Sequence, residues 1–514
     1  MSGAKQVFYV TTPIYYPNDV PHIGHAYTTV ATDFVARYHR LRGEEVMFLT
    51  GTDEHGKKVP QAAAEQGLEP QEFVDQMEPK WREVWELLDI SNDDYIRTTE
   101  SRHEAAVKKL LTAVHENGKD DIYLGSYEGL YCVSCEAYYT EDELVDGKCP
   151  IHGRPVEQMS EENYFFRLSA YQDRLLEYYD KNPSAIEPEA RRNEVLSVIR
   201  SGLRDFSISR TSFAWGVPLP WDEKHVCYVW FDALTNYITA AGYGSDEERF
   251  ARTWPADVHF IGKDILRFHA IYWPAMLMAA GVELPLQVWA HGFLLVGGEK
   301  MSKTKLTGIH PKVLVDHFGM DAYRYHFMRE IQFGQDGSFS WESMTDRYNA
   351  DLANGLGNLA SRVLAMIGSY FEGAVPEPKA EGAESDLPAV AADSAKRYDE
   401  LIDGVELSPA LGAVWDLVGR ANQYLVEKEP WAIAKDESRK EEVGSILYAS
   451  AEVLRILAIL VYPIMPGAAV ALWVQLGIDE GLESQRLPKA AAWGGLAPGT
   501  IVTKGEGLFP RLED

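Results

Sequence analysis

Residues Val7–Gly56, VFYVTTPIYYPNDVPHIGHAYTTVATDFVARYHRLRGEEVMFLTGTDEHG, decide the fold of this chain. Val7–Val10 predicts a short strand that leads into a turn-rich segment, and Val46–Leu49 predicts a second strand. Gly43 stands where a helix between them should end. Apolar side chains recur every three or four residues on one face of that helix: Ile23, Ala26, Val30, Phe34, Tyr38 and Leu41. Strand–helix–strand at this spacing predicts a parallel βαβ unit.

The rest of the chain extends this unit in two directions. Residues from about 120 to 222 contain cysteines and short aromatic segments, which predicts an insertion with its own small metal-stapled core. Val226–Phe231 and Val258–Ile261 then restore apolar strand character, so one α/β sheet domain is expected on both sides of the insertion. From about residue 350 the apolar spacing is helical, and the Pro- and acid-rich stretch within Phe371–Asp403 predicts a linker or surface loop.

Composition limits the functions that are open. The chain has 514 residues with 49 basic and 78 acidic side chains, so its formal net charge is 49 − 78 = −29. A general polyanion binder shows the opposite balance, so DNA and loosely held RNA are disfavoured as partners. The absence of an 18-residue uncharged apolar run and of a leader pattern predicts no membrane association. With only four cysteines, a reducing cytoplasm is the expected compartment.

The segment Pro21-His22-Ile23-Gly24-His25 lies between the first strand and the helix. A helix amino terminus presents free N–H groups and a partial positive charge, which suit a phosphate. Gly24 permits close approach to the backbone. His22 and His25 share one side of the first turn, where both can donate to phosphate oxygens. The alternative interpretation is a pair of surface histidines at a helix end.

A second candidate is the loop Gly297–Thr304, GGEKMSKT. Lys300 and Lys303 follow a flexible Gly-Gly pair, and mobile ammonium groups can close over a triphosphate and neutralise developing charge. The spacing is not that of a Walker A loop. Considered alone, two lysines in a loop indicate only solvated charge.

The cysteines follow the pattern C-x2-C-x13-C-x2-H. Its ligands are Cys132, Cys135, Cys149 and His152. Two short turns that each present two ligands are typical of a tetrahedral Zn²⁺ site. Because the protein fills all four positions, we expect a structural rather than a catalytic zinc.

Asn358 and Arg362 are four residues apart and therefore share a helix face, and Trp431 follows Glu429-Pro430 further along the chain. An amide, a guanidinium and an indole suit the edges and faces of single-stranded bases. The alternative is an ordinary packing set within a helix bundle.

Taken together, the His22–His25 and Lys300–Lys303 segments resemble the paired signatures of class I aminoacyl-tRNA synthetases. Gly262–His269 resembles the G-x-D-x-x-x-x-H segment that, in several of these enzymes, meets the ATP ribose. In detail the chain is similar to the bacterial methionyl-tRNA synthetases over nearly its whole length. That resemblance implies an enzyme that activates L-methionine with ATP and Mg²⁺ and then transfers methionyl to the terminal adenosine of tRNA(Met).

The resemblance also implies roles for particular residues. Those expected to bind ATP are His22, Gly24, His25, Gly262, Asp264, Lys300, Lys303 and Thr304, of which His22, His25, Lys300 and Lys303 are the catalytic set. Those expected to bind methionine are Ile14, Tyr16, Asp53, Trp230, Ala233, Tyr237, Ile265, Phe268 and His269. Those expected to read the CAU anticodon are Asn358, Arg362 and Trp431. The chain departs from the family pattern at Thr304, where Ser is common, and at Leu234, where some relatives have Pro.

The expected fold class is α/β, a split Rossmann-like parallel-sheet catalytic domain with a zinc-knuckle insertion and a carboxy-terminal α-helical bundle. The expected parts are the first half of the catalytic domain (1–115), the insertion (116–224), the second half (225–292), the lysine-loop connecting domain (293–349) and the anticodon-binding bundle (350–514). The chain ends soon after the bundle, so a monomer is expected. Two alternatives stay open, a cysteine-specific class I synthetase and a non-catalytic tRNA-binding paralogue.

Overall fold

The computed structural model describes residues 5–117, 120–132, 137–139, 141–150, 153–296, 299–300, 309–379 and 385–512. By its internal contacts the chain forms two compact units. The first consists of Met1–Thr32, Glu45–Glu86 and Ser91–Gly292, and the second of Asp33–Glu44, Leu87–Ile90 and Phe293–Asp514. Each unit is described by itself.

The centre of the first unit is a six-stranded sheet in which all neighbouring strands pair in parallel. In spatial order its strands are β3 (Asp94–Arg97), β2 (Val46–Thr52), β1 (Phe8–Tyr15), β12 (Val258–Gly262), β13 (Val288–His291) and β7 (Ile186–Glu187). The predicted parallel βαβ unit and the Rossmann-like sheet are therefore confirmed. One edge strand, β7, comes from within the range expected to be the insertion.

Helices surround the strands of this sheet in the sequence. They are α1 (Ile23–Leu41), α2 (Lys58–Gln66), α3 (Pro70–Leu87), α4 (Ser101–Asn117), α5 (Gln172–Lys181), α6 (Glu189–Arg200), α7 (Val229–Leu234), α8 (Asn236–Ala241), α9 (Glu247–Thr253) and α10 (Trp273–Ala280). Several of them, α4, α5, α6, α8 and α10 among them, share one apolar core with the strands. The six residues predicted for the buried face of the first helix, from Ile23 to Leu41, are all 2% exposed or less. The 3.6-residue period therefore identified the buried face correctly.

Two strand predictions need correction. The first strand does not end at Val10 but continues to Tyr15, because the register with β2 shifts between Thr11 and Ile14 and so accommodates Pro13. Val226–Phe231 is not a strand of the main sheet. Its first two residues end β11 (Asp222–Cys227), which pairs antiparallel in a small separate sheet, and helix α7 begins at Val229.

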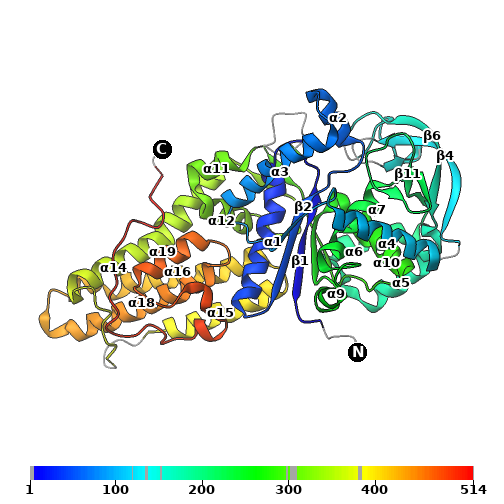
Figure 1. Cartoon of the computed structure of the whole chain (residues 1–514). Coiled ribbons are helices and arrows are strands. Elements are labelled where there is room, and N and C mark those ends of the chain that lie inside the picture. Colours follow the sequence, from blue (N-terminus) through cyan, green and yellow to red (C-terminus); the bar gives the residue numbers. More distant parts are fainter. Residues whose placement is uncertain are drawn as a thin grey trace. The chain divides into compact units, whose positions relative to one another are not determined.

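A four-stranded antiparallel sheet lies within the expected insertion, and Figure 1 labels its two long strands, β4 and β6. Its strands are β5 (Ala137–Tyr139), β4 (Ile122–Cys132), β6 (Glu157–Phe166) and β8 (Phe206–Ser207). The longest pairing joins β4 to β6 and runs from Ile122↔Phe166 to Tyr131↔Glu157. This antiparallel sheet is separate from the parallel one, although β7 from the same range joins the parallel sheet.

The second unit is mainly helical, as predicted for residues after about 350. Its helices are α11 (Pro311–Phe318), α12 (Met320–Glu330), α13 (Trp341–Arg347), the π-helical η6 (Tyr348–Gly357), α14 (Asn358–Phe371), α15 (Leu387–Asp403), α16 (Leu407–Lys428), α17 (Pro430–Ile433), α18 (Lys440–Val461) and α19 (Pro466–Gln475). Helices α14, α16 and α18 lie side by side in Figure 1. The small strands β14 (Leu294–Val296), β15 (Glu299–Lys300) and β16 (Gly337–Phe339) form a further sheet.

Two helices of this unit qualify the sequence expectations. Residues from Leu387 to Asp403 form α15 and not a linker; its buried side chains Leu387, Ala391, Tyr398 and Ile402 follow helical spacing. Among the described residues, the stretch Glu437–Val461 is long and apolar enough to cross a membrane, but its apolar window is entirely buried inside the protein. That burial is what the core helix of a bundle shows.

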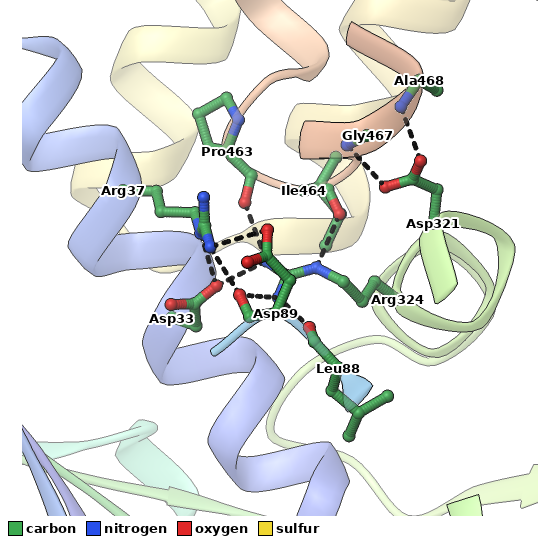
Figure 2. A network of polar contacts seen from close by, with 10 residues as sticks. All are labelled: Asp33, Arg37, Leu88, Asp89, Asp321, Arg324, Pro463, Ile464, Gly467 and Ala468. Carbon is green, nitrogen blue, oxygen red and sulfur yellow. Dashed lines mark hydrogen bonds and ion pairs between the residues drawn. The ribbon is translucent and has the colours of Figure 1, made fainter. Parts of the chain in front are cut away.

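A buried arginine ties four segments of the second unit together (Figure 2). The guanidinium of Arg324 on α12 pairs with Asp33 at 2.6 Å and donates to the carbonyl oxygens of Ile464 at 2.8 Å, Leu88 at 2.9 Å and Pro463 at 3.0 Å. Both charged side chains of the pair are fully buried. Arg37 also binds Asp33, at 2.8 Å. An arginine in such a place needs all its donors satisfied, and this one has partners on every nitrogen.

Candidate active site

The carboxyl ends of the parallel strands bring three sequence motifs to one edge of the first unit. Tyr16 follows β1, Asp53 follows β2, and Asp264 follows β12. The strand order reverses between β1 and β12, which are neighbours in the sheet although about 250 residues apart in sequence. A crevice at such a reversal is the usual ligand site of open parallel sheets.

At this edge the histidines of the first motif stand where α1 begins. Their rings stack with centroids 3.7 Å apart at an angle of 23°. The backbone N–H of Gly24 donates to His22 Nδ1 at 3.1 Å, and the backbone N–H of His22 donates to His25 Nδ1 at 3.2 Å. Because each Nδ1 accepts, the proton of each neutral ring lies on Nε2. Both rings thus carry a donor of the kind that a phosphate oxygen requires.

The aromatic rings of Tyr15 and Trp81 pack against the ring of His25. Its ring centroid lies 5.1 Å from Tyr15 and 5.1 Å from Trp81, and those two rings stack at 5.3 Å. Trp81 Nε1 donates to the carbonyl oxygen of Asp19 at 3.1 Å. The sequence interpretation missed Trp81. Its spacing of four from Trp85 on α3 was the available signal.

Most of the residues predicted to bind methionine pack around one core in the first unit. Trp230 and Phe268 stack face to face at 3.8 Å and 4°. Ile14, Trp230, Ile265 and Phe268 are partly buried and pack against the core cluster that contains Leu234 and Tyr237, and Ala233 beside them is 4% exposed. Leu234, at the position of the family's occasional Pro, is 2% exposed and belongs to that core.

A tyrosine and a histidine form the polar part of this group. His269 Nδ1 donates to the carbonyl oxygen of Ile265 at 3.0 Å, so Nε2 accepts the hydroxyl proton of Tyr237 at 2.7 Å. Burial lowers the pKa of His269 to about 4, so the ring is neutral at physiological pH. Burial likewise raises the pKa of Tyr237. The hydroxyl proton of Tyr237 is therefore held in the hydrogen bond to His269.

The acidic and glycine residues of the edge have defined positions. Asp53 is 3% exposed, and its backbone N–H donates to the carbonyl oxygen of Tyr15 at 2.9 Å. The ammonium group of Lys58 lies 3.6 Å above the ring of Tyr16. A Cβ on Gly262 would stand 2.6 Å from Asp264 Oδ1, so a side chain at this position would require the exposed carboxylate of Asp264 to move.

The lysine loop belongs to the second unit and is described only in part. Lys300 lies in β15, opposite Leu295 of β14. Lys303 and Thr304 lie outside the described residues. The structure therefore places residues 299–300 of this loop in a short antiparallel pair.

The predicted base-reading residues also lie in the second unit. The guanidinium of Arg362 stands over the indole of Trp431, 4.9 Å from the ring centroid. Asn358 is exposed one turn earlier on the same helix, α14. Two residues that are 69 positions apart in sequence (431 − 362) are thus in cation–π contact.

Comparison with known families agrees with this geometry. The family described as tRNA synthetases class I (M) matches residues 8–158 and 151–364, and the anticodon binding domain of methionyl tRNA ligase matches residues 375–514. The chain belongs to the methionyl-tRNA synthetase family. Its activity is that of the family, the ATP-dependent ligation of methionine to tRNA. The cysteine-specific and non-catalytic alternatives have no support in these matches.

Similar methionyl-tRNA synthetases match over almost the entire chain. The methionine–tRNA ligase of Streptomyces coelicolor is 52% identical, with 100% of this chain and 98% of that protein aligned. The ligase of Bacillus subtilis is 48% identical over 100% of this chain and 79% of that protein. The Mycobacterium tuberculosis methionyl-tRNA synthetase in complex with methionyl-adenylate has a TM-score of 0.93 and 46% identity, covering 98% of this chain and 100% of that one.

The predicted zinc ligands of this synthetase are only half described. Cys132 and Cys149 are each 1% exposed, whereas Cys135 and His152 lie outside the described residues. Within the described ranges no group of three or more potential metal ligands is present, which leaves the four-ligand prediction untested. Cys132 pairs with Ala137 across β4 and β5, and the N–H of Gly153 donates to the carbonyl oxygen of Cys149 at 2.8 Å. Each cysteine therefore stands at a chain reversal, as zinc knuckles require.

Proposed function

We propose that the carboxyl edge of the parallel sheet is where this synthetase forms methionyl-adenylate and pyrophosphate from methionine and ATP. The observation that carries the proposal is that three motifs, at the ends of β1, β2 and β12, meet where the strand order of the sheet reverses. Each motif brings a different chemistry, namely imidazole donors, a buried carboxylate and an aromatic group.

In this proposal methionine lies against the stacked Trp230 and Phe268, which offer a flat apolar wall to its long thin side chain. Asp53 binds the substrate ammonium group, since a buried carboxylate has a high affinity for a cation that replaces lost water. Ile14, Tyr16, Ala233, Tyr237, Ile265 and His269 complete the pocket.

The nucleotide steps rest on positioning and charge. His22 and His25 donate from Nε2 to the ATP phosphates while the methionine carboxylate attacks the α-phosphorus and pyrophosphate leaves. Lys300 and Lys303 neutralise the pyrophosphate, Thr304 adds a hydroxyl donor, and Gly24, Gly262 and Asp264 shape the nucleoside side. Mg²⁺ is expected on the β- and γ-phosphates as part of the nucleotide substrate. The 2′-hydroxyl of the terminal adenosine of tRNA(Met) then attacks the carbonyl carbon of methionyl-adenylate, the new ester bond forms, and AMP leaves.

Two further sites belong to the same proposal. Asn358, Arg362 and Trp431 read the anticodon, supported by the stacked guanidinium and indole. Cys132, Cys135, Cys149 and His152 hold a structural Zn²⁺, supported by two buried thiols at chain reversals. When bound, the metal would stabilise the antiparallel module. The five-part division of the chain, a monomer and a cytoplasmic location complete the proposal.

The decisive experiment compares ATP–pyrophosphate exchange by the wild-type protein and Lys303→Ala, across methionine and cysteine. Methionine alone should support exchange. Lys303→Ala should lower its rate by about 10²–10³-fold, the usual effect of removing one charge-stabilising donor, while methionine binding measured by calorimetry stays unchanged. Exchange at the wild-type rate in Lys303→Ala would refute the role of the loop.

A further inference from the structure

A carboxylate lies buried between two histidines from distant parts of the first unit. Asp232 on α7 is fully buried, with Oδ2 2.6 Å from His55 Nδ1 and Oδ1 2.8 Å from His103 Nε2. His55 follows β2 in the GTDEHG segment, and His103 lies in the first turn of α4. A carboxylate only accepts, so each ring carries a proton on the nitrogen that faces Asp232.

The contacts with the two histidines keep the carboxyl group of Asp232 ionised. Burial alone would raise the pKa of Asp232, but the two histidines lower it to about 2. Burial alone would lower the pKa of His55, but the adjacent carboxylate raises it. An ionised carboxylate without solvent contact is expensive to maintain, and apolar side chains of the same size often give equal stability. Two hydrogen bonds fix the orientation of the Asp232 carboxylate and its distance from each histidine. This points to a role in positioning those histidines rather than in filling the core.

Both ends of the His55–Asp232 bond are attached to residues of the proposed methionine pocket. Asp53 stands two residues before His55, and Trp230 stands two residues before Asp232. The bond therefore connects the segment that carries the ammonium-binding carboxylate to the segment that carries the aromatic wall.

Other bonds hold the Asp53 segment against different neighbours. The N–H of Asp53 donates to Tyr15 O at 2.9 Å, and the N–H of Glu54 donates to Thr98 Oγ1 at 2.9 Å. Trp215 Nε1 donates to Glu54 O at 2.7 Å, and its ring packs edge-on to that of His55 at 5.6 Å. These contacts orient the segment toward β1, the loop after β3, and Trp215. The bond from His55 supplies its connection to α7.

We propose that Asp232 is a positioning residue for methionine recognition, which acts through His55 to set the separation between Asp53 and Trp230. His103 anchors the same carboxylate to α4. The inference rests on the assignment of Asp53 and Trp230 to the methionine pocket. Loss of this positioning contact should have a large effect on activity, since displacement of a binding group by about 1 Å can cost about 10²-fold in rate.

The test compares three variants in ATP–pyrophosphate exchange, with the KM values for methionine and ATP measured separately. Asp232→Asn keeps the size but leaves one accepting oxygen, and His55→Gln removes the ring on the pocket side. Both should raise the KM for methionine about tenfold, equivalent to about 1.4 kcal/mol, while the KM for ATP changes less than about twofold. His103→Gln is the matched control. It breaks the other bond of Asp232, so it should lower the melting temperature comparably yet leave the KM for methionine within about twofold.

Two results would overturn the proposal. One is an equal rise in the KM for methionine in His103→Gln, and the other is a parallel rise for methionine and ATP, because either is what a merely structural role produces. Should Asp232→Asn fail to fold, His55→Gln against His103→Gln gives the same comparison. Asp53→Ala separates the premise from the inference. An unchanged KM for methionine in Asp53→Ala removes the pocket assignment, whereas a raised value there with no change in Asp232→Asn or His55→Gln refutes the positioning role alone.

Discussion

Replacing Arg324 by methionine should destabilise the second unit severely, for a reason visible in Figure 2. The substitution keeps an unbranched side chain of similar length but removes every donor. Asp33, fully buried, then loses its 2.6 Å partner, and three carbonyl oxygens lose theirs. Arg37 still binds Asp33 at 2.8 Å, so the carboxylate is not left entirely without a cation.

The magnitude follows from the burial. Removal of one partner of a buried ion pair costs about 3–5 kcal/mol, and each buried carbonyl left without a donor adds to that cost. For a unit of this size about 2–4 °C of melting temperature corresponds to each kcal/mol, so the expected shift is about 6–20 °C. A matched surface control is Arg397→Met. Arg397 binds Asp416 at 2.9 Å with exposed fractions of 44% and 60%, and its loss should cost about 1 kcal/mol or less.

The assay must resolve the second unit, because a chain of two units does not unfold in one step. Calorimetry gives the transition, and hydrogen exchange of peptides from α12 and α19 assigns it. Adding Asp33→Asn to Arg324→Met should restore part of the loss, since a neutral amide is cheaper to bury than a carboxylate that has lost one of its two cations. If Arg324→Met shifts the transition no more than Arg397→Met, or if Asp33→Asn makes it worse by its full single-variant cost, the reasoning fails.

Three further predictions concern the sites. Trp431→Ala should lower kcat/KM for tRNA charging about 10- to 100-fold, the cost of about 1–3 kcal/mol for one lost base stack, and leave ATP–pyrophosphate exchange unchanged; a fall in both rates would contradict an anticodon role. Purified protein should contain about one zinc per chain by elemental analysis, and Cys132→Ser with Cys149→Ser should abolish it; metal retained at the wild-type level would exclude the site. Burial depresses the pKa of His269 to about 4, so the unfolded chain takes up this proton first and stability falls as pH decreases from about 6.5 toward 4. His269→Gln should therefore lose less stability than the wild type over that window in urea titrations, and equal losses would show that another group is responsible.

Sequence patterns predicted those parts of the fold where a period or a spacing is long enough to be unique. The buried face from Ile23 to Leu41 repeats for five turns, which no strand can imitate. Val226–Phe231 was misassigned because a six-residue apolar run fits a strand and a buried helix equally well, and here the chain changes from one to the other at Tyr228. Helix α15 was missed because its Pro and acidic residues suggested a linker, although Leu387, Ala391 and Tyr398 were correctly spaced.

The residues of the site were likewise predictable only where a short local motif contains them. A local motif predicted His22 and His25, and the resemblance to the synthetase family implied Asp53 and Trp230, since each lies within a short segment of recognisable sequence. The bond from Asp232 to His55 spans 177 positions, and no local pattern encodes the meeting of two such side chains. Contacts of this kind depend on the strand order and appear only when the sheet is assembled.

The network around Arg324 also has a consequence for the order in which the protein can fold as it is made. Asp33 leaves the ribosome 291 positions before its partner, and Ile464 follows Arg324 by another 140. At typical rates of about 5–20 residues per second, Asp33 can pair with Arg37 at once but waits many seconds for Arg324, which in turn waits longer for its last acceptors. The second unit therefore closes only when nearly the whole chain has been synthesised. A fragment that begins at residue 293 lacks both Asp33 and Leu88, so it should not mature into the same unit on its own.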